Sequence, residues 1–331
     1  VKDLAFNKYT WLVTHNSFSI VNAPTLPNVE RVTFYNQEDT VTNQLNEPAI
    51  NTLKEVESFL RDNPTEIVTI IIEDYVHTPK GLTKLFKNAG LLKYWFPISK
   101  MPESGKDWPT VAKMVEDGHR LLVFTSVASK EADEGIAYQW RYMVENESGD
   151  PGVVQGSCPN RKESQALNSK SASLFFQNYF PTFPVEEQAC KEHSVGLVEM
   201  IGTCYKAAGN LMPNFLAVNF YMRSDGEGVF DAVDRMNGQA LCGCPTVTTC
   251  QVGSPFGSCK NITAFGRTPT TTTPTTTAPG GRSFSGSVQL SGTTSTLQIP
   301  NLMLEVVGPG GSPDGHGNHH SSNVNGNDMM S

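Results

Sequence analysis

The chain has 331 residues, of which 38% are hydrophobic, and this suits one sizeable α/β domain or two small ones. A formal net charge of −8 excludes a broad surface for nucleic acid or for an anionic membrane. No apolar run reaches the length of about 18 residues that a transmembrane helix needs, and because the chain starts at Val1 we expect any signal peptide to lie upstream.

Strand and helix patterns alternate along the first 260 residues. Buried strands are predicted at 11–14 (WLVT), 66–76 (EIVTIIIEDYV), 120–126 (RLLVFTS), 173–180 (SLFFQNYF) and 214–221 (NFLAVNFY). Helices are predicted at 47–62, 81–96, 110–118 and around 186–209. This alternation predicts a parallel sheet, either open or closed as a barrel.

The alternation fails at one place. Residues 37–46 (QEDTVTNQLN) have a helical pattern and run directly into the helix predicted at 47–62, with no strand between them. Because a parallel sheet needs a strand after each crossover helix, we expect a strand to be missing near this junction.

The composition changes after about Gly266. Residues 268–281 (TPTTTTPTTTAPGG) are Thr/Pro-rich, and a Gly/Ser/Asn-rich stretch continues to Ser331. Such a stretch cannot bury a core and is typical of an O-glycosylated extracellular stalk. We therefore predict a folded domain at 1–260 and a disordered stalk or tail at 261–331. The apolar patch 302–307 is too short for a membrane anchor, and no lipid-anchor signal is visible.

Seven cysteines bear on the compartment, and four of them lie between Cys242 and Cys259. A zinc site would need CxxC spacing or a nearby histidine, which this stretch lacks, so we favour disulfides in an oxidising compartment. The odd count leaves one cysteine without a partner in this chain. Two N-glycosylation sequons, at Asn146 and Asn261, agree with a secreted glycoprotein.

Several polar residues follow predicted strands and are candidates for a site. His15 and Asn16 come after the first strand, and Glu73 closes the apolar run of the second. Arg223, with Tyr221 beside it, follows the last strand and is a candidate for contacting a phosphate or a polyol. Each of these also has an ordinary interpretation, as a loop residue or a solvated strand end.

Longer blocks of the sequence resemble one known family. The blocks YTWLVTHNSF, NQEDTVTNQL, EIVTIIIEDYV, HRLLVFTS, GIAYQWRYMVEN, CPNR and PNFLAVNFYMRSDGEGVFDAVDRMNG occur in this order. They are similar to plant proteins of the phosphatidylinositol-specific phospholipase C-like phosphodiesterase family. The resemblance covers nearly all of residues 4–260. It implies a TIM-type (β/α) barrel and a secreted or cell-surface location.

The resemblance also implies roles for individual residues. His15 matches the histidine that acts as general base, and Asn219 stands where some relatives have an aspartate that orients it. Asn16 and Glu73 match calcium ligands, so Ca²⁺ is the implied cofactor. The implied substrate and partner is a phospholipid headgroup or a glycerophosphodiester, with a membrane surface as a further candidate partner.

A segment that relatives carry is missing between Asn46 and Glu47. It contains strands of the type VRGxMLDxYD and WLCHSF, the second of which holds the catalytic acid histidine. Its loss would remove the acid, a ligand and one or two barrel strands. We therefore expect a phosphoric diester hydrolase whose barrel is incomplete and whose activity is impaired or lost. Two alternatives stay open, namely a non-catalytic cell-surface binding or structural module, and a truncated splice or gene-model product of an active enzyme.

Overall fold

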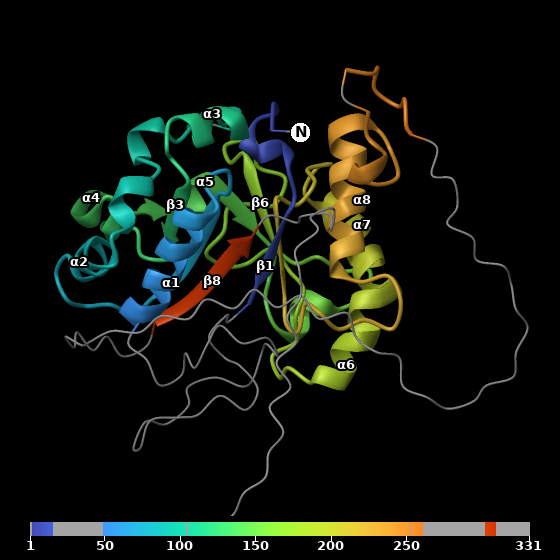
Figure 1. The fold of residues 1–331 in the computed structure, drawn as a ribbon. Coiled ribbons are helices and arrows are strands. Elements are labelled where there is room, and N and C mark those ends of the chain that lie inside the picture. Colours follow the sequence, from blue (N-terminus) through green and yellow to red (C-terminus); the bar gives the residue numbers. More distant parts are fainter. Residues whose placement is uncertain (1, 16–48, 104, 252, 261–301, 309–331) are drawn as a thin grey trace, which may run out of the picture.

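The structure is a computed structural model that describes residues 2–15, 49–103, 105–251, 253–260 and 302–308. Strands and helices alternate along most of this range (Figure 1). The predicted helix at 37–46, the candidate ligand Asn16 and the Asn46–Glu47 junction lie outside the described residues.

All eight described strands belong to one sheet. Their bounds are β1 (Trp11–Thr14), β2 (Val68–Asp74), β3 (Leu121–Thr125), β4 (Ala137–Tyr138), β5 (Met143–Glu145), β6 (Leu174–Asn178), β7 (Phe215–Val218) and β8 (Leu302–Gly308). Their order in the sheet is β4-β3-β2-β8-β1-β7-β6-β5. Among the described strands every pairing is parallel except those of β8, which is antiparallel to both of its neighbours.

Helices connect the strands. The α-helices are α1 (Ala49–Asp62), α2 (Gly81–Asn88), α3 (Val111–Glu116), α4 (Ser129–Glu134), α5 (Gln139–Tyr142), α6 (Glu186–Lys191), α7 (Leu197–Ala207) and α8 (Val229–Cys242). Short 3₁₀ helices span Phe6–Lys8, Leu91–Tyr94, Ile98–Lys100, Asp150–Val153 and Val247–Thr249, and a π-helical turn at Glu192–Gly196 joins α6 to α7. Among the described residues, no helix is both long and apolar enough to span a bilayer.

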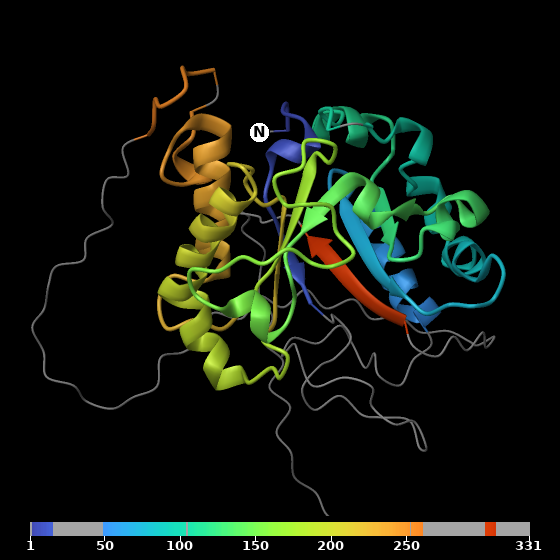
Figure 2. The same cartoon turned by 180° about the vertical axis from the view of Figure 1, so that it is seen from behind.

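Three apolar clusters form the core. One cluster packs on the inner face of the curved sheet and takes side chains from both of its halves, including Trp11, Phe124 and Phe176. The outer face is covered in two parts. Helices α1 and α2 cover β2 and β3, whereas α7 and α8 cover β1, β6 and β7 (Figures 1 and 2). The strands are thus buried on both faces, as their continuous apolar runs predict.

The structure confirms a mixed α/β fold with parallel strands but not a closed barrel. Strands β4 and β5 are the two ends of the sheet and do not pair with each other among the described residues. The chain between them forms only the single turn of α5. The sheet therefore curves around its inner core while staying open between β4 and β5.

Local sequence accounts for several of these elements. Helix α1 buries Leu53, Val56 and Leu60, which the 3.6-residue period puts on one face. Helix α3 begins after Thr110, whose hydroxyl oxygen accepts a hydrogen bond from the amide of Lys113 at 3.1 Å. The strand β2 is the most continuous apolar run and is almost entirely buried.

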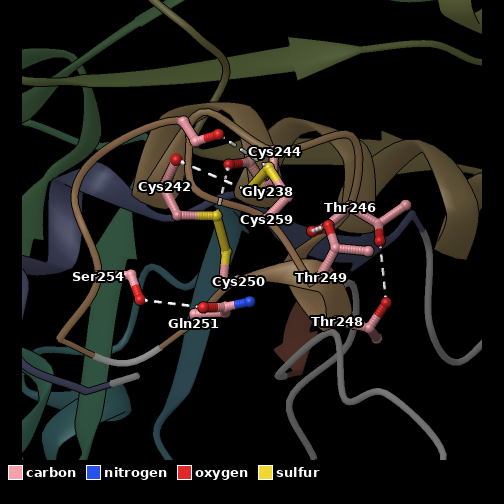
Figure 3. Close-up of a disulfide and its surroundings, with 11 residues drawn as sticks. Gly238, Cys242, Cys244, Thr246, Thr248, Thr249, Cys250, Gln251, Ser254 and Cys259 are labelled. Atoms are coloured by element: carbon pink, nitrogen blue, oxygen red, sulfur yellow. Dashed lines mark hydrogen bonds between the residues drawn. A yellow bond between two sulfur atoms is a disulfide. The ribbon is translucent and has the colours of Figure 1, made fainter. Parts of the chain in front are cut away.

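The cysteines form the disulfides that the sequence favours. Cys158 bonds to Cys204, Cys242 to Cys250 and Cys244 to Cys259, and the seventh cysteine, Cys190, lies outside these three bonds. The bond between Cys242 and Cys250 ties the segment after α8 to the last residue of that helix, and the bond between Cys244 and Cys259 closes residues 244–259 into a cap (Figure 3). They compensate for the small apolar content of this cap.

One strand comes from the stretch predicted to be a tail. Residues 302–308 pair with β1 and β2 in the middle of the sheet (Figure 1). Low-complexity composition predicts no such strand, although residues 302–307 stand out as its one apolar patch. The rest of residues 261–331 lies outside the described part, so the domain division at 260 stays a prediction.

Candidate functional site

Polar side chains gather where the parallel strands end. His15 follows β1, Glu73 lies near the end of β2, Glu145 ends β5, Asn178 ends β6 and Asn219 follows β7. Each lies an even number of residues after an inner-face core residue of its strand, so the alternation of strand side chains directs it to the inner side. Because the parallel strands end at the same edge, these polar groups meet there.

A pocket of about 110 Å³ opens among these groups. It is lined by His15, Ile71, Glu73, Ser126, Gln139, Trp140, Glu145, Ser148, Arg161, Asn178 and Phe180. Its wall therefore carries a histidine, a guanidinium and two carboxylates, together with the aromatic rings of Trp140 and Phe180.

The imidazole of His15 is held in one orientation. Its Nδ1 lies 2.8 Å from Oδ1 of Asn219, and its ring stacks on Phe180 with the centroids 3.6 Å apart. Because the amide oxygen can only accept, Nδ1 carries the hydrogen and Nε2 is the basic nitrogen.

The protonation state of His15 follows from its surroundings. Burial lowers the pKa of His15 to about 4, the hydrogen bond to Asn219 opposes this shift, and the positive charge of Arg161 adds to it. The imidazole is therefore neutral at pH 7, which is the state that a general base requires.

Arg161 supplies positive charge to the pocket. Its Nη1 lies 3.2 Å from a carboxylate oxygen of Glu145, and its Nε lies 3.2 Å from one of Glu163. Its guanidinium lies 5.5 Å from the ring centroid of Trp140. The side chain keeps 24% of its surface exposed, so the cation faces both the protein and the pocket.

The carboxylate of Glu145 holds the guanidinium of Arg161 in place. Besides Arg161, its carboxylate accepts hydrogen bonds from Gln139 (2.9 Å), Trp140 (2.7 Å) and Asn178 (2.9 Å). Burial raises the pKa of Glu145, and Arg161 and the hydrogen-bond donors oppose that shift. Because all four partners are donors, the group acts as a carboxylate acceptor.

Glu73 is the second carboxylate that lines the pocket. The hydroxyl of Tyr75 donates a hydrogen bond of 2.6 Å to Oε1 of Glu73, and this bond raises the pKa of Tyr75 to about 12. Across the described part of the chain, no three His, Cys, Asp or Glu side chains come close enough to hold a metal ion. Asn16, the other predicted calcium ligand, lies outside that part.

Arg223 and Tyr221 do not line this pocket. The guanidinium of Arg223 forms an ion pair with Glu186, and its carbonyl oxygen lies 2.8 Å from Nδ1 of His193. The ring of Tyr221 meets Phe230 edge-on, with the centroids 5.8 Å apart. The structure therefore joins His15, Asn219 and Glu73 but sets Arg223 and Tyr221 apart from the pocket.

Sequence reasoning missed Arg161, Glu145 and Asn178 as site residues. Glu145 carries the same signal as Glu73, namely an acidic residue that ends an apolar run, but its run of YMV is only three residues long. Arg161 lies in a loop outside any periodic pattern, within the CPNR block. Its place in the pocket depends on tertiary contacts.

Comparison with known proteins identifies the family of the chain. The family model for the PI-PLC X domain matches residues 36–175. A PI-PLC X domain-containing protein of Arabidopsis thaliana is 62% identical over 338 residues, covering 92% of this chain and 79% of the relative. Because 338 aligned positions exceed 92% of a 331-residue chain, the relative fills positions that this chain lacks.

A more distant relative is an uncharacterized secreted protein of Arthroderma benhamiae. It is 23% identical over 207 residues, which cover 56% of this chain and about half (46%) of that protein. No solved structure matches the chain. The extent and identity of the Arabidopsis match, together with the family model, establish that the chain belongs to the PI-PLC X domain family.

Proposed function

We propose that the pocket binds the phosphate of a phosphoinositide- or glycerophosphodiester-type headgroup. The observation that carries this proposal is that Arg161 and His15 line the same pocket. A guanidinium presents fixed N–H donors that match phosphate oxygens, and the buried carboxylate of Glu145 fixes its position. Arg161 thus takes the role that the sequence suggested for Arg223.

His15 would act as general base in this site. Nε2 of the neutral imidazole would take a proton from an attacking hydroxyl, either of the substrate or of water, while that oxygen bonds to phosphorus. Asn219 accepts from Nδ1 and so keeps the basic nitrogen in the right tautomer. An amide stabilises the resulting imidazolium less than a carboxylate would, which limits the contribution of this base.

The departing oxygen would also need a proton, and no suitable donor stands out in the described part of the pocket. Glu145 is a hydrogen-bond acceptor on all sides, and the histidines at 77, 119 and 193 are not among the pocket residues. A missing acid removes roughly 10²–10⁴ in rate. We infer a phosphoric diester hydrolase of the phospholipase C type whose activity is impaired or lost in this chain.

The calcium that the resemblance implies stays a prediction. Calcium takes about six to eight oxygen ligands; Glu73 lies in the described pocket, whereas Asn16 lies outside the described residues. No step of the proposed chemistry is routed through a metal. Arg161 would supply positive charge on the phosphate.

A non-catalytic binding module is the second candidate, and the lack of an evident acid in the described pocket favours it. An extracellular or cell-surface location suits both candidates. Three disulfides support that location because they persist in oxidising compartments. The similarity to a secreted fungal protein supports it as well.

Headgroup binding tests the proposal. Inositol 1-phosphate, titrated into the purified chain by calorimetry, should bind, and Arg161→Gln should weaken binding roughly 10- to 100-fold through loss of a charge-assisted contact. Arg223→Gln is the matched control and should change the affinity less than about twofold, because Arg223 pairs with Glu186 outside the pocket. The reverse pattern would restore Arg223 as the phosphate ligand and overturn the proposal.

A further inference from the structure

The strand β8 lies between β1 and β2 and pairs with both. Its register sets Val307 opposite both Val13 and Thr69, and Val306 opposite both Thr14 and Ile70. Further along β2, Glu73 and Asp74 lie opposite Met303 and Leu302. The strand is thus an internal member of the sheet. In Figure 1 it is the red arrow beside β1.

The rest of the sheet follows chain order. Strands β2, β3 and β4 are successive parallel neighbours, and so are β5, β6 and β7, with β7 next to β1. Only between β1 and β2 does a strand from elsewhere in the chain enter, and it enters antiparallel. The Asn46–Glu47 junction, where alternation fails in the sequence, also lies between β1 and β2 in chain order.

The edges that β8 covers are buried. Leu12 and Val13 on β1, and Ile70, Ile71 and Ile72 on β2, each have 7% or less of their surface exposed. Without β8, the backbone N–H and C=O groups on these two edges would lose their strand partners. Each such group that stayed buried without a partner would cost about 1–3 kcal/mol, and the apolar side chains beside it would lose cover, so an open slot here would be unfavourable.

We propose that residues 302–308 are an integral closing strand, and that the slot between β1 and β2 is a strand-binding site for this segment of the same chain. The segment's sequence, LMLEVVG, has the apolar, β-branched character that an internal strand needs. The 41 residues from 261 to 301 can span roughly 130 Å when extended. The chain after Lys260 is therefore long enough for residues 302–308 to reach the slot between β1 and β2.

The closing strand would also fix the separation of β1 and β2, which position residues of the pocket. A strand inserted between β1 and β2 holds them two strand spacings apart, about 9–10 Å. His15 follows β1 and Glu73 lies on β2, so the distance between these two pocket residues depends on a segment that comes more than 200 residues later. This inference does not depend on phosphate binding.

Cysteine cross-linking in the full-length chain tests the proposal. Val13→Cys and Val307→Cys, in a Cys190→Ser background, introduce thiols at opposed positions of antiparallel strands, where Cα separations suit a disulfide. We expect mild oxidation to give a monomeric, internally linked product. The pair Val13→Cys and Leu304→Cys is the control and should not link, because Leu304 lies opposite Ile72. Linkage between two chains, or none, would overturn the proposal.

A proline gives a second, independent readout. Val306→Pro removes a donor from a strand that is paired on both sides, so hydrogen exchange should become at least tenfold faster at 12–14 and 69–74 but not at β6 or β7. Leu297→Pro, outside the strand, should leave exchange unchanged. A synthetic peptide of residues 300–309 should restore protection in Val306→Pro. Unchanged exchange at β1 and β2 in Val306→Pro would contradict the proposal. If Val306→Pro fails to fold, the cross-linking experiment alone tests whether β8 pairs with β1.

Discussion

At the scale of single residues, the charge of the pocket depends on one buried carboxylate. Glu145 is 3% exposed and accepts from four side chains, among them Arg161. Glu163 contacts the same guanidinium at the same distance of 3.2 Å, but about half of its side chain is exposed. Solvent weakens the second pair much more than the first.

Replacing Glu145 should therefore have a large effect on stability. We expect Glu145→Gln to lower the free energy of unfolding by roughly 2–4 kcal/mol, because it leaves a half-buried guanidinium without its main partner. The matched control Glu163→Gln should cost less than about 1 kcal/mol. Urea denaturation at pH 7 measures both, and equal costs for the two variants would show that Glu145 does not anchor Arg161.

Two histidines with lowered pKa values should make the protein sensitive to mild acid. Burial lowers the pKa of His15 and of His193 to about 4 each. Because the unfolded chain binds these protons near pH 6.5, the free energy of unfolding should fall as the pH drops from 6.5 towards 4, by roughly 3 kcal/mol per histidine. Above pH 6.5 both contributions are fully present.

Chemical denaturation across this pH range tests the role of His15. His15→Gln should remove the contribution of His15 to the pH dependence between 6.5 and 4 and leave that of His193. His77→Gln is the control and should leave the pH dependence intact, because His77 is exposed. The same pH dependence in His15→Gln as in the unchanged protein would contradict the buried, neutral state of His15.

The sequence identified half of the site and missed the other half for a physical reason. His15 and Glu73 directly follow or end apolar runs, so strand direction alone predicts that they meet. Asn219 likewise directly follows the apolar run of β7. Arg161, in contrast, lies in a loop and reaches the pocket through its ion pair with Glu145, a contact between residues that no local pattern links. Arg223 follows a strand directly, yet its ion pair with Glu186 turns it away.

At the scale of elements, helix α8 and its disulfide-bonded cap depend on one close approach. A Cβ atom at Gly238 would come within 2.7 Å of backbone atoms of Thr246. The amide of Cys244 also donates to the carbonyl oxygen of Gly238 at 3.1 Å, so the chain folds back tightly against the helix here. Only a residue without a side chain allows this approach.

Alanine at Gly238 should therefore destabilise the protein. We expect a loss of about 1–3 kcal/mol from overpacking against backbone that two disulfides restrain. Gly202 in α7 is the matched control, since nothing lies within 4 Å of a Cβ there. Gly202→Ala should stabilise the protein by up to about 1 kcal/mol through helix propensity. Thermal melts of the two variants that shift in the same direction would refute this account.

Elements with long, regular patterns were predicted well, and elements fixed by tertiary contacts were not. The predicted strands at 66–76 and 173–180 correspond to β2 and β6, and the helix at 47–62 to α1. Strands β4 and β5, of two and three residues, are too short to have a period. The strand β8 pairs only with segments far away in the chain, so its local sequence within the tail indicates an apolar patch and no more.

At the scale of the whole molecule, two irregularities fall between β1 and β2. The alternation of strand and helix fails before α1, and an antiparallel strand enters the sheet between β1 and β2. The Arabidopsis relative also has aligned positions that this chain lacks. We propose that the chain is a shortened member of the PI-PLC X domain family in which β8 pairs with the strand edges that the missing segment would otherwise cover. His15 follows β1 and Arg161 lies in a loop between β5 and β6, and the two residues line one pocket in this chain.

Turnover measured beside headgroup binding, on one sample of the purified 331-residue chain, tests this account most directly. Phosphatidylinositol vesicles and a glycerophosphodiester serve as substrates, with His15→Ala as the background and with Ca²⁺ present or chelated. We predict that inositol 1-phosphate binds in an Arg161-dependent way while product release stays within about tenfold of the His15→Ala background. Turnover well above that background, lost on His15→Ala, would contradict the claim that this chain keeps the pocket without the catalytic acid.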